Sequence, residues 1–332
     1  MSFLIVGAGS WGCATGLQLA RMKHDVVIWG RDADQIKRMQ ETRENKRYLP
    51  GVNFPENVSF VSDALEKYIS KCEYVVVAVP SHVFREVLEK IKPHFSHQQT
   101  LMWITKGLDP KTNQLLHYVV QEMLGNTVKL AVLSGPSFAE EVAEDLPTAV
   151  TIASNDLHIA EKLVKLFHSP RFRVYASTDI VGVEVGGAMK NVLAIAVGIA
   201  QGLGCGANAQ AALITRGLAE MMRLGKELGG LPETFMGLTG VGDLILTCTN
   251  DMSRNRRFGV AVGKGQSREA ALKTIDQVVE GLKTTKEIYS LKKKHPIDMP
   301  IVEQVYKVLY ENVSPSQALE ALLAREPKGE RQ

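Results

Sequence analysis

The first half of the chain alternates between short, strongly apolar runs and longer segments with helical periodicity. Five of the runs are FLIV (3–6), VVIW (26–29), YVVVAV (74–79), TLMWIT (100–105) and LAVLSG (130–135). Because they lack a polar side, they suit strands of a parallel sheet that helices cover on both faces. Two further runs, TAVTIAS (148–154) and FRVYAS (172–177), extend the predicted sheet to about residue 177.

After residue 177 the strand-like runs stop and the pattern becomes helical. The segment 208–229 is rich in alanine and repeats leucine and methionine at near-helical spacing, which is typical of core packing. A later helix has a clear start, with Ser314 as N-cap, Pro315 at the first helical position and Gln317 at capping-box distance. We expect an α/β fold in which a doubly wound sheet is followed by an all-helical half.

Composition narrows the class of protein. The 332 residues are 45% hydrophobic and 23% charged, enough for a sizeable core and two domains. A net charge of +3 does not favour nucleic acid or a membrane surface as a partner, although local basic clusters suit small anions. The four cysteines, Cys13, Cys72, Cys205 and Cys248, form no Cys-x-x-Cys pair, so we expect no disulfide framework and no metal site. The amino terminus lacks a secretory signal, and we expect a cytoplasmic protein.

One long segment, VEVGGAMKNVLAIAVGIA (183–200), is almost entirely small and apolar. Glu184, Lys190 and Asn191 interrupt it, and the remainder falls short of the roughly 20 apolar residues that span a bilayer. We therefore expect a core helix and no membrane span.

A glycine motif follows the first predicted strand. Gly7, Gly9 and Gly12 in GAGSWG have the G-x-G-x-x-G spacing between a strand and a helix-like segment. In this motif the first glycine makes a tight turn, the second lets backbone approach a pyrophosphate, and the third lets helix and strand pack closely. The pyrophosphate then lies at the helix amino terminus. The motif predicts a Rossmann-like dinucleotide-binding domain over residues 1–180. The helical pattern that follows predicts a second domain over 181–332, which we expect to bind the substrate and carry catalytic groups.

Arg31 stands where NAD-selective sites usually place a ribose-binding carboxylate. An arginine there favours the 2′-phosphate of NADPH. The alternative is a surface charge paired with Asp32 or Asp34.

Lys190 is the best candidate for the proton donor that a nicotinamide-dependent reduction of a carbonyl needs. Partial burial among small and apolar neighbours would lower its pKa, and a nearby carboxylate could hold it in place. The alternative is that Lys190 extends from a helix face to solvent. Its spacing does not separate the two.

Three other polar clusters lie in apolar or glycine-rich settings. Lys106 follows a predicted strand, where ligands of doubly wound sheets gather. Ser137 in LSGPSFAEE has Glu140 at capping-box distance, so it is a candidate N-cap, and the same helix start could present Gly135 and Ser137 to an anion. In the third segment Asp243 follows a glycine turn, and a cluster dense in donors comes after it, which suits a phosphate: Ser253, Arg254, Asn255 and Arg256.

Taken together, the residues resemble the bacterial biosynthetic type of NAD(P)-dependent glycerol-3-phosphate dehydrogenases. The resemblance covers nearly the whole chain through ten ordered blocks: GAGSWG, NKRYLPG, VVVAVPS, TKGL, SGPSFAEEV, VGGAMKNVLAIAVGI, ITRGLAEM, LTGVGDLILTCT, SRNRRFG and VVEGLKT. It implies interconversion of dihydroxyacetone phosphate and sn-glycerol 3-phosphate with NADPH or NADH, supplying glycerol 3-phosphate for phospholipid synthesis. A homodimer is also an expectation of this family.

The resemblance also implies roles for individual residues. Lys190 would be the catalytic acid and base, Lys106 would contact substrate and cofactor, and Asp243 would position or tune Lys190. Further substrate contacts would be Gly135, Ser137, Asn191, Ser253, Arg254 and Asn255. Further cofactor contacts would be Ser10, Trp11, Arg31, Ala139, Arg254, Val278 and Glu280, although a carboxylate such as Glu280 near a helix start could equally be a dipole partner.

Two rival functions remain open on the sequence. A β-hydroxyacid dehydrogenase would share the glycine-rich start and a helical lysine. That group usually has an asparagine four residues after the lysine, where this chain has Ala194 and instead places Asn191 next to the lysine. A redox sensor that binds NAD(H) without turnover is the other rival, and the presence of Lys106, Lys190 and Asp243 together disfavours it.

Overall fold

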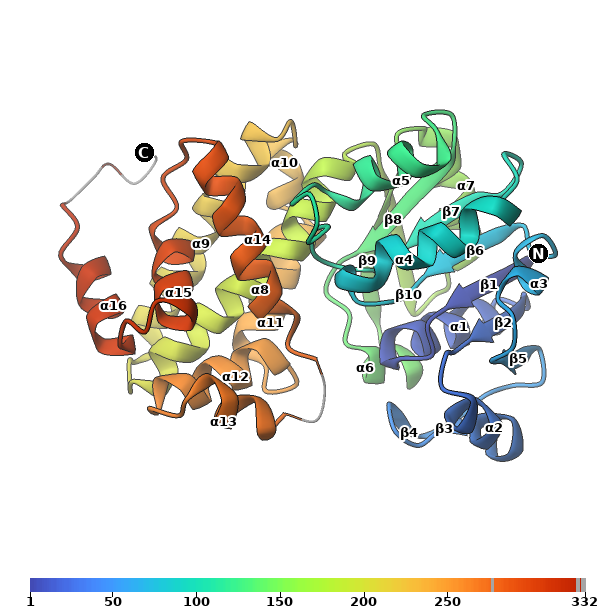
Figure 1. Cartoon of the computed structure of the whole chain (residues 1–332), viewed down its shortest axis with the longest axis horizontal. Coiled ribbons are helices and arrows are strands. Elements are labelled where there is room, and N and C mark those ends of the chain that lie inside the picture. Colours follow the sequence, from blue (N-terminus) through green and yellow to red (C-terminus); the bar gives the residue numbers. More distant parts are fainter. Residues whose placement is uncertain (276–277, 327–328, 330–332) are drawn as a thin grey trace.

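The computed structural model describes residues 1–275, 278–326 and 329. Figure 1 shows a lobe built around a sheet, which contains the amino terminus, beside a lobe of helices built from the second half of the chain. Among the described residues no strand follows β10, so the predicted order of a doubly wound sheet and then helices is confirmed.

The sheet has eight strands in the order β10-β9-β8-β7-β6-β1-β2-β5. β1 pairs with β2 on one side and β6 on the other, so the direction of winding reverses between β1 and β6. In such sheets ligands bind beyond the carboxyl ends of the strands at this reversal. The strands are β1 (Ser2–Val6), β2 (Asp25–Trp29), β5 (Val58–Val61), β6 (Tyr74–Val77), β7 (Thr100–Trp103), β8 (Lys129–Ser134), β9 (Thr148–Ala153) and β10 (Phe172–Ser177).

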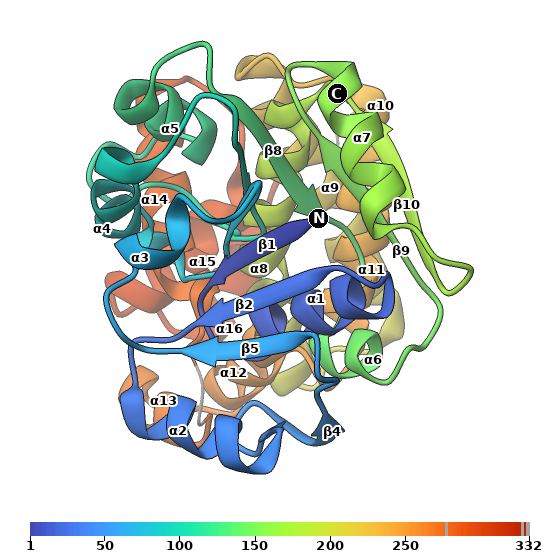
Figure 2. The ribbon, with the colours of Figure 1, turned by 90° about the vertical axis from the view of Figure 1, so that its right-hand side faces the viewer.

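Alternation along the central strand explains why both faces of the sheet are covered. In β1, Phe3 and Ile5 belong to the core on one face, while Leu4 and Val6 belong to the core on the other. Figure 2 views this lobe from its end, with helices on both sides. The first face is covered by α1 (Ser10–Arg21), α6 (Ala139–Ala143) and α7 (Leu157–Phe167), and the second by α3 (Glu66–Ile69), α4 (Ser81–Ile91) and α5 (Leu116–Leu124).

Parts of the sheet lobe differ from the sequence prediction. β9 pairs antiparallel with β8, whereas a parallel sheet was expected. The five-residue α6 is too short to carry the chain back along a full strand, as a parallel connection requires. The prediction also missed β5 and the small hairpin of β3 (Glu44–Asn45) and β4 (Leu49–Asn53), which follow α2 (Ala33–Thr42) and are short with exposed residues.

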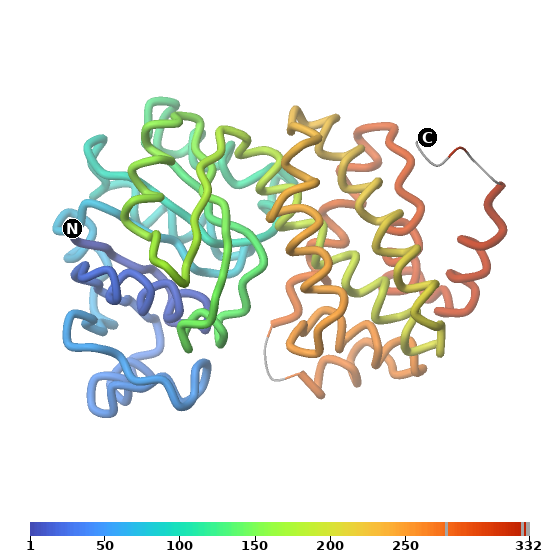
Figure 3. The backbone as a smooth tube through the Cα atoms, turned by 180° about the vertical axis from the view of Figure 1, so that it is seen from behind, coloured from blue at the N-terminus to red at the C-terminus, as the bar shows by residue number. Residues whose placement is uncertain are grey.

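The helical lobe is built around α8 (Ile180–Gly202), which is buried along most of its length. Figure 3 shows the surrounding helices from behind. They are α9 (Ala207–Glu227), α10 (Pro232–Phe235), α11 (Asp243–Thr249), α12 (Arg254–Gly263), α13 (Arg268–Lys273), α14 (Glu280–Lys294), α15 (Pro300–Tyr310) and α16 (Pro315–Leu323). The predicted start of α16 is confirmed, with the full capping box of Ser314 and Gln317 and Pro315 in the first turn.

α8 and α12 pack unusually closely. A side chain at Gly198 would overlap the backbone of Arg256, and one at Gly259 would overlap the backbone of Ile195. Glycine at the crossing therefore lets the two helix backbones touch, which brings the amino-terminal end of α12 beside the middle of α8.

Of the described helices, α8 alone is long and apolar enough to cross a membrane by length and composition, but 94% of the relevant window is buried inside the protein. Its apolar side chains are accounted for by the core of the helical lobe. Across the described ranges, no group of three or more His, Cys, Asp or Glu residues is placed to hold a metal ion.

Candidate active site

The glycine loop after β1 has a different neighbour at each glycine. Gly7 has φ +129°, and a Cβ there would overlap the carbonyl of Ala78, beyond the end of β6. A Cβ at Gly12 would overlap the carbonyl of Gly7, so this glycine permits the close contact of α1 with the loop. A Cβ at Gly9 would meet nothing within 4 Å. The loop thus leaves open space at the glycine where the motif predicts that a pyrophosphate approaches.

Ser10 and Trp11 begin α1, and Ala139 begins α6, which packs against α1. Arg21 joins the two helices by donating to the carbonyl of Val142 at 2.7 Å. The packing places two predicted cofactor contacts, Trp11 and Ala139, on the same face of the sheet, where both are partly buried against its core.

Arg31 lies beyond the end of β2 and is exposed. Asp32 caps α2 by accepting from the N–H of Gln35 at 3.0 Å, and within the described residues no ion pair joins Arg31 to Asp32 or Asp34. Burial lowers the pKa of His82, and the positive charges of Lys283 and Arg31 lower it further, so these two cations lie near it. The described residues thus show Arg31 as an exposed charge without a contact to either aspartate, and its role at a 2′-phosphate stays a prediction.

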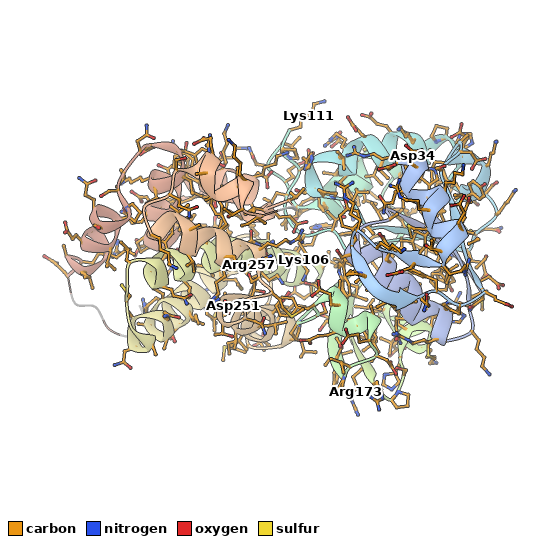
Figure 4. The ribbon with its side chains drawn as sticks, turned by 90° about the horizontal axis from the view of Figure 1, so that it is seen from below. Asp34, Lys106, Lys111, Arg173, Asp251 and Arg257 are labelled. Atoms are coloured by element: carbon orange, nitrogen blue, oxygen red, sulfur yellow. The ribbon has the colours of Figure 1, made fainter. Side chains whose placement is uncertain are left out.

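Three predicted residues meet in one buried cluster at the junction of the lobes, where Figure 4 labels Lys106. Lys106, three residues beyond β7, donates from Nζ to Oδ2 of Asp243 at 2.7 Å. Lys190, in the middle of α8, donates from Nζ to Oδ1 of the same carboxylate. Lys190 is 7% exposed, so the alternative in which it extends to solvent is wrong.

Burial and charge act in opposite directions on this cluster. Burial disfavours the charged form of Lys190 and lowers its pKa to about 7, although Asp243 partly offsets this effect. Burial alone would raise the pKa of the Asp243 carboxyl, but the charges of Lys106 and Lys190 outweigh it and hold this pKa below its usual range. The cluster thus holds a lysine that can gain or lose a proton near neutral pH beside a carboxylate that stays ionised.

The local backbone fixes Asp243 in place. A π-helical turn, Leu238–Gly242, leads directly into α11, of which Asp243 is the first residue. A side chain at Gly186 of α8 would overlap the carbonyl of Thr239, so the turn lies directly on α8. One turn later in α11, the hydroxyl of Thr247 donates to the carbonyl of Asp243 at 2.6 Å and lies 3.4 Å from Oδ1.

Lys106 passes over a gap in the surface of α8. A Cβ at Gly187 would lie 3.5 Å from Cγ of Lys106 and 3.1 Å from the hydroxyl of Ser134, at the end of β8. This hydroxyl is buried and makes no hydrogen bond within the described residues. The missing side chain at Gly187 therefore leaves room for the stem of Lys106 between α8 and the sheet.

A second cluster lies next to the first along α8. The amide of Asn255 donates to the amide oxygen of Asn191 at 2.9 Å, and its own oxygen accepts from the N–H of Gly281 at 2.9 Å. Asn191 in turn donates to Glu280 at 3.5 Å. Three predicted residues are thus brought together at the start of α14. Val278, just before it, is 48% exposed.

The remaining predicted residues have mixed surroundings. Ser253 caps α12 by accepting from the N–H of Arg256, and Arg254 begins this helix. Ser137 does not cap a helix as predicted, because α6 begins at Ala139 and the Ser137 hydroxyl donates to the carbonyl of Gly135 at 2.9 Å. Gly135 has φ +144°, a conformation that few other residues adopt.

The segment after β6 connects the glycine loop to Lys106. Ala78 contacts Gly7, as described above, and a Cβ at Gly107 would lie 2.9 Å from the hydroxyl of Ser81, a few residues further along. The same Cβ would lie 3.5 Å from the hydroxyl of Thr284, one turn after Glu280 in α14. The glycine loop, Lys106 and the start of α14 therefore converge at the carboxyl end of the sheet.

A separate hollow of about 560 Å³ lies at the opposite, amino-terminal end of the strands. Its lining includes Tyr74, Thr100, Lys129 and Lys162, and none of the predicted site residues. We therefore place the candidate active site at the carboxyl end of the strands, where the titratable cluster and the glycine loop, with its open space at Gly9, occur together.

Comparison with known proteins agrees with this geometry. Two family models, described as the N-terminus and C-terminus of NAD-dependent glycerol-3-phosphate dehydrogenase, match residues 2–160 and 179–320. The chain belongs to the NAD-dependent glycerol-3-phosphate dehydrogenase family. A protein of Colwellia psychrerythraea named glycerol-3-phosphate dehydrogenase (NAD(P)+) is 51% identical over 98% of this chain and 98% of its own length. One of the same name from Pseudoalteromonas translucida is 50% identical over 98% and 97%.

Solved structures of the glycerol-3-phosphate dehydrogenase family have the same fold. The crystal structure of the Coxiella burnetii enzyme has a TM-score of 0.94 and 47% identity, covering 98% of this chain and 99% of that one. A ketopantoate reductase from Ralstonia eutropha, at 16% identity and a TM-score of 0.62, shares the fold alone. Membership of this family sets aside the β-hydroxyacid dehydrogenase interpretation.

The sequence prediction missed two groups in or beside the site. Thr247 lies four residues after Asp243, a helical spacing that could have suggested their contact. Glu184 is a charged residue in an apolar helix, and the prediction used it only as an interruption of a membrane span. Its partners, Trp103 and His117, lie far away in the sequence, so spacing gives no signal for them.

Proposed function

We propose that this chain interconverts dihydroxyacetone phosphate and sn-glycerol 3-phosphate with NADPH or NADH. The observation that carries the proposal is the buried cluster in which Lys106 and Lys190 bind the two oxygens of the Asp243 carboxylate. It places a lysine with a pKa near neutrality at the carboxyl end of a dinucleotide-type sheet. This is the acid and base that reduction of a ketone requires.

The reaction assigns a separate task to each charged group. Lys190 donates a proton to the carbonyl oxygen during reduction and accepts it back during oxidation. Lys106 orients the substrate and polarises its oxygen, and Asp243 holds both ammonium groups at fixed positions. Because Asp243 stays ionised, it also limits how far burial lowers the pKa of Lys190.

The phosphate of the substrate would lie near the start of α12. Arg254 supplies a guanidinium, and the amide nitrogen of Asn255 donates one N–H to Asn191 and, within the described residues, has a second N–H left for an acceptor. Gly135 and Ser137, together with Ser253, would complete the substrate contacts. Asn191 supports the site by holding Asn255.

The residues present fit a dinucleotide. Gly7, Gly9 and Gly12 provide a close turn with open space at Gly9, Ser10 and Trp11 begin α1, and Ala139 begins α6, which packs against α1. Arg31 would meet a ribose 2′-phosphate, while Lys106, Arg254, Val278 and Glu280 would contact the nicotinamide half. When bound, the reduced nicotinamide supplies the hydride for C2 of the ketone.

We also propose the cellular setting. The product, glycerol 3-phosphate, would supply phospholipid synthesis in the cytoplasm, and the chain would act as a homodimer. The division into domains at residue 180 belongs to this proposal, and it falls where β10 has ended and α8 begins. The end of the second proposed domain, at residues 327–328 and 330–332, lies outside the described residues.

A substrate panel tests the proposed function. Purified protein is assayed with NADPH and with NADH against dihydroxyacetone phosphate, and in the oxidative direction with NADP⁺ and NAD⁺ against 3-hydroxyisobutyrate and 6-phosphogluconate. We expect turnover with dihydroxyacetone phosphate alone. Faster turnover of either hydroxyacid would contradict the proposal, and binding of NADPH without oxidation by any substrate would favour a redox sensor.

A further inference from the structure

Glu184 is a buried carboxylate of α8 that has no part in the proposed chemistry. It is 6% exposed and lies six residues before Lys190, about 9 Å earlier along the helix axis. Its Oε1 accepts from the indole N–H of Trp103 at 3.2 Å and from the backbone N–H of His117 at 3.1 Å. Its Oε2 lies 2.5 Å from Nδ1 of His117. One side chain of the helical lobe thus holds two elements of the sheet lobe.

These partners lie close to Lys106 along the chain. Trp103 is the last residue of β7, fully buried, and Lys106 follows it by three residues. Lys190 lies on the same helix as Glu184. Segments 103–106 and 184–190 therefore form a closed frame. They are joined at one end by the contact of Trp103 with Glu184, and at the other by Asp243, which binds both Lys106 and Lys190.

The cap on α5 is also unusual in its origin. The residue before this helix, Leu115, has no side chain that can accept from the free N–H groups of the first turn. Glu184 from α8 accepts from one of them instead. Since burial of a carboxylate is costly, its three contacts across the junction of the lobes indicate a role that a local serine or aspartate cap would not provide.

We infer that Glu184 is a positioning residue, which sets the distance between Lys106 and Lys190 by tying β7 and α5 to α8. The inference rests on the proposed function, because it concerns the geometry of that same cluster. A misplacement of about 1 Å in an active site can lower turnover by up to about 100-fold. Loss of the Glu184 contacts should therefore lower kcat without removing any group that touches substrate or cofactor.

The chain offers a matched control in Glu220. This carboxylate of α9 is 1% exposed and accepts from the backbone N–H groups of Ile301 and Val302 at 2.7 and 3.1 Å, at the start of α15. Like Glu184, it is a buried glutamate that caps a helix belonging to another part of the chain. None of its partners belongs to the proposed active site.

The experiment compares Glu184→Ala, Glu184→Gln and Glu220→Ala in the full chain. It measures the thermal midpoint, the Kd of NADPH, and kcat and KM for dihydroxyacetone phosphate across pH. We expect both alanine variants to lower the thermal midpoint, whereas Glu184→Ala alone lowers kcat, by about 10-fold or more, and shifts the pH profile. Glu184→Gln should restore most of kcat, because its amide keeps an oxygen for Trp103 and the His117 N–H.

Provided that the wild-type protein is active, two results would overturn the inference. One is a Glu184→Ala variant with the kcat of the wild type, and the other is an equal loss of kcat in Glu220→Ala. If Glu184→Ala does not fold, Trp103→Phe takes its place, since it removes the indole N–H while keeping an aromatic ring. An unchanged kcat in that variant would also contradict the frame. A wild-type protein with no activity on dihydroxyacetone phosphate would instead contradict the proposed function, and the inference would fail with it.

Discussion

The ammonium groups of Lys106 and Lys190 bind opposite oxygens of one buried carboxylate, that of Asp243. Lys106 comes from the sheet lobe and Lys190 from the central helix of the other lobe. The cluster therefore joins the lobes chemically, and burial, partly offset by the charge of Asp243, sets the pKa of Lys190. The predictions below change one component of this arrangement at a time.

The pH dependence should have opposite signs in the two directions. Burial lowers the pKa of Lys190 to about 7. Reduction of the ketone needs the protonated amine, so its kcat/KM should fall as the pH rises through about 7. Oxidation of glycerol 3-phosphate needs the neutral amine and should rise through the same range. Steady-state rates in both directions measure this.

The matched control for that profile is Glu287, because burial raises the pKa of its carboxyl to about 7 as well. Glu287→Gln should leave the pH dependence of both reaction directions unchanged. If the change in rate near pH 7 disappears in this variant, the titrating group is Glu287 and the assignment to Lys190 fails.

Asp243→Asn should remove the negative charge while keeping the shape of the side chain. We expect kcat to fall by about 100-fold or more, and the pH limb to move to lower pH, because the charged form of Lys190 loses its counter-ion. Asp251→Asn is the control, since Asp251 is an exposed aspartate of the same lobe paired with Arg256. Comparable losses in the two variants would show that the effect is not specific to the cluster.

Arg31→Ala should weaken NADPH binding by about 10- to 100-fold and leave NADH nearly unchanged, because only NADPH carries the 2′-phosphate. Arg38→Ala removes the same charge from an exposed position on α2 and should affect neither. Fluorescence titration gives both Kd values. Equal losses for the two cofactors in Arg31→Ala would remove Arg31 from this role.

Gly187→Ala should fill the gap beside the stem of Lys106. We expect kcat to fall by about 10-fold while the thermal midpoint stays the same or rises, because alanine favours a helix over glycine by about 0.5–1 kcal/mol. The new methyl would lie 3.1 Å from the Ser134 hydroxyl, so Ser134→Ala in the same chain should recover part of the activity. Purely additive effects of the two substitutions would contradict the packing argument.

The apolar runs were sufficient to predict most of the sheet, because a strand that is buried on both faces is apolar at nearly every position. Phe3, Leu4, Ile5 and Val6 are all fully buried. The runs did not predict the reversed direction of β9, since a buried strand reads the same in either direction. β5 was missed because its residues alternate between buried and exposed over only four positions.

The candidate site was predicted residue by residue, but not as a cluster. The sequence suggested a carboxylate partner for Lys190 without showing how it is reached. Asp243 lies 53 residues away and is brought back by a π-helical turn lying against Gly186. Ser137 shows the opposite error, since a capping spacing occurred by chance and the N-cap position lies one residue later, at Phe138. Local spacing predicts local hydrogen bonds, whereas contacts between lobes depend on how helices cross.

Turnover of dihydroxyacetone phosphate by Lys190→Met is the most direct test of the account. Methionine keeps the length and apolar stem of the side chain and removes the proton donor. With NADPH as cofactor, we predict an unchanged Kd for NADPH and a kcat lower by about 100- to 10,000-fold at pH 7. A variant that binds NADPH and retains near-normal kcat would contradict the central role of Lys190.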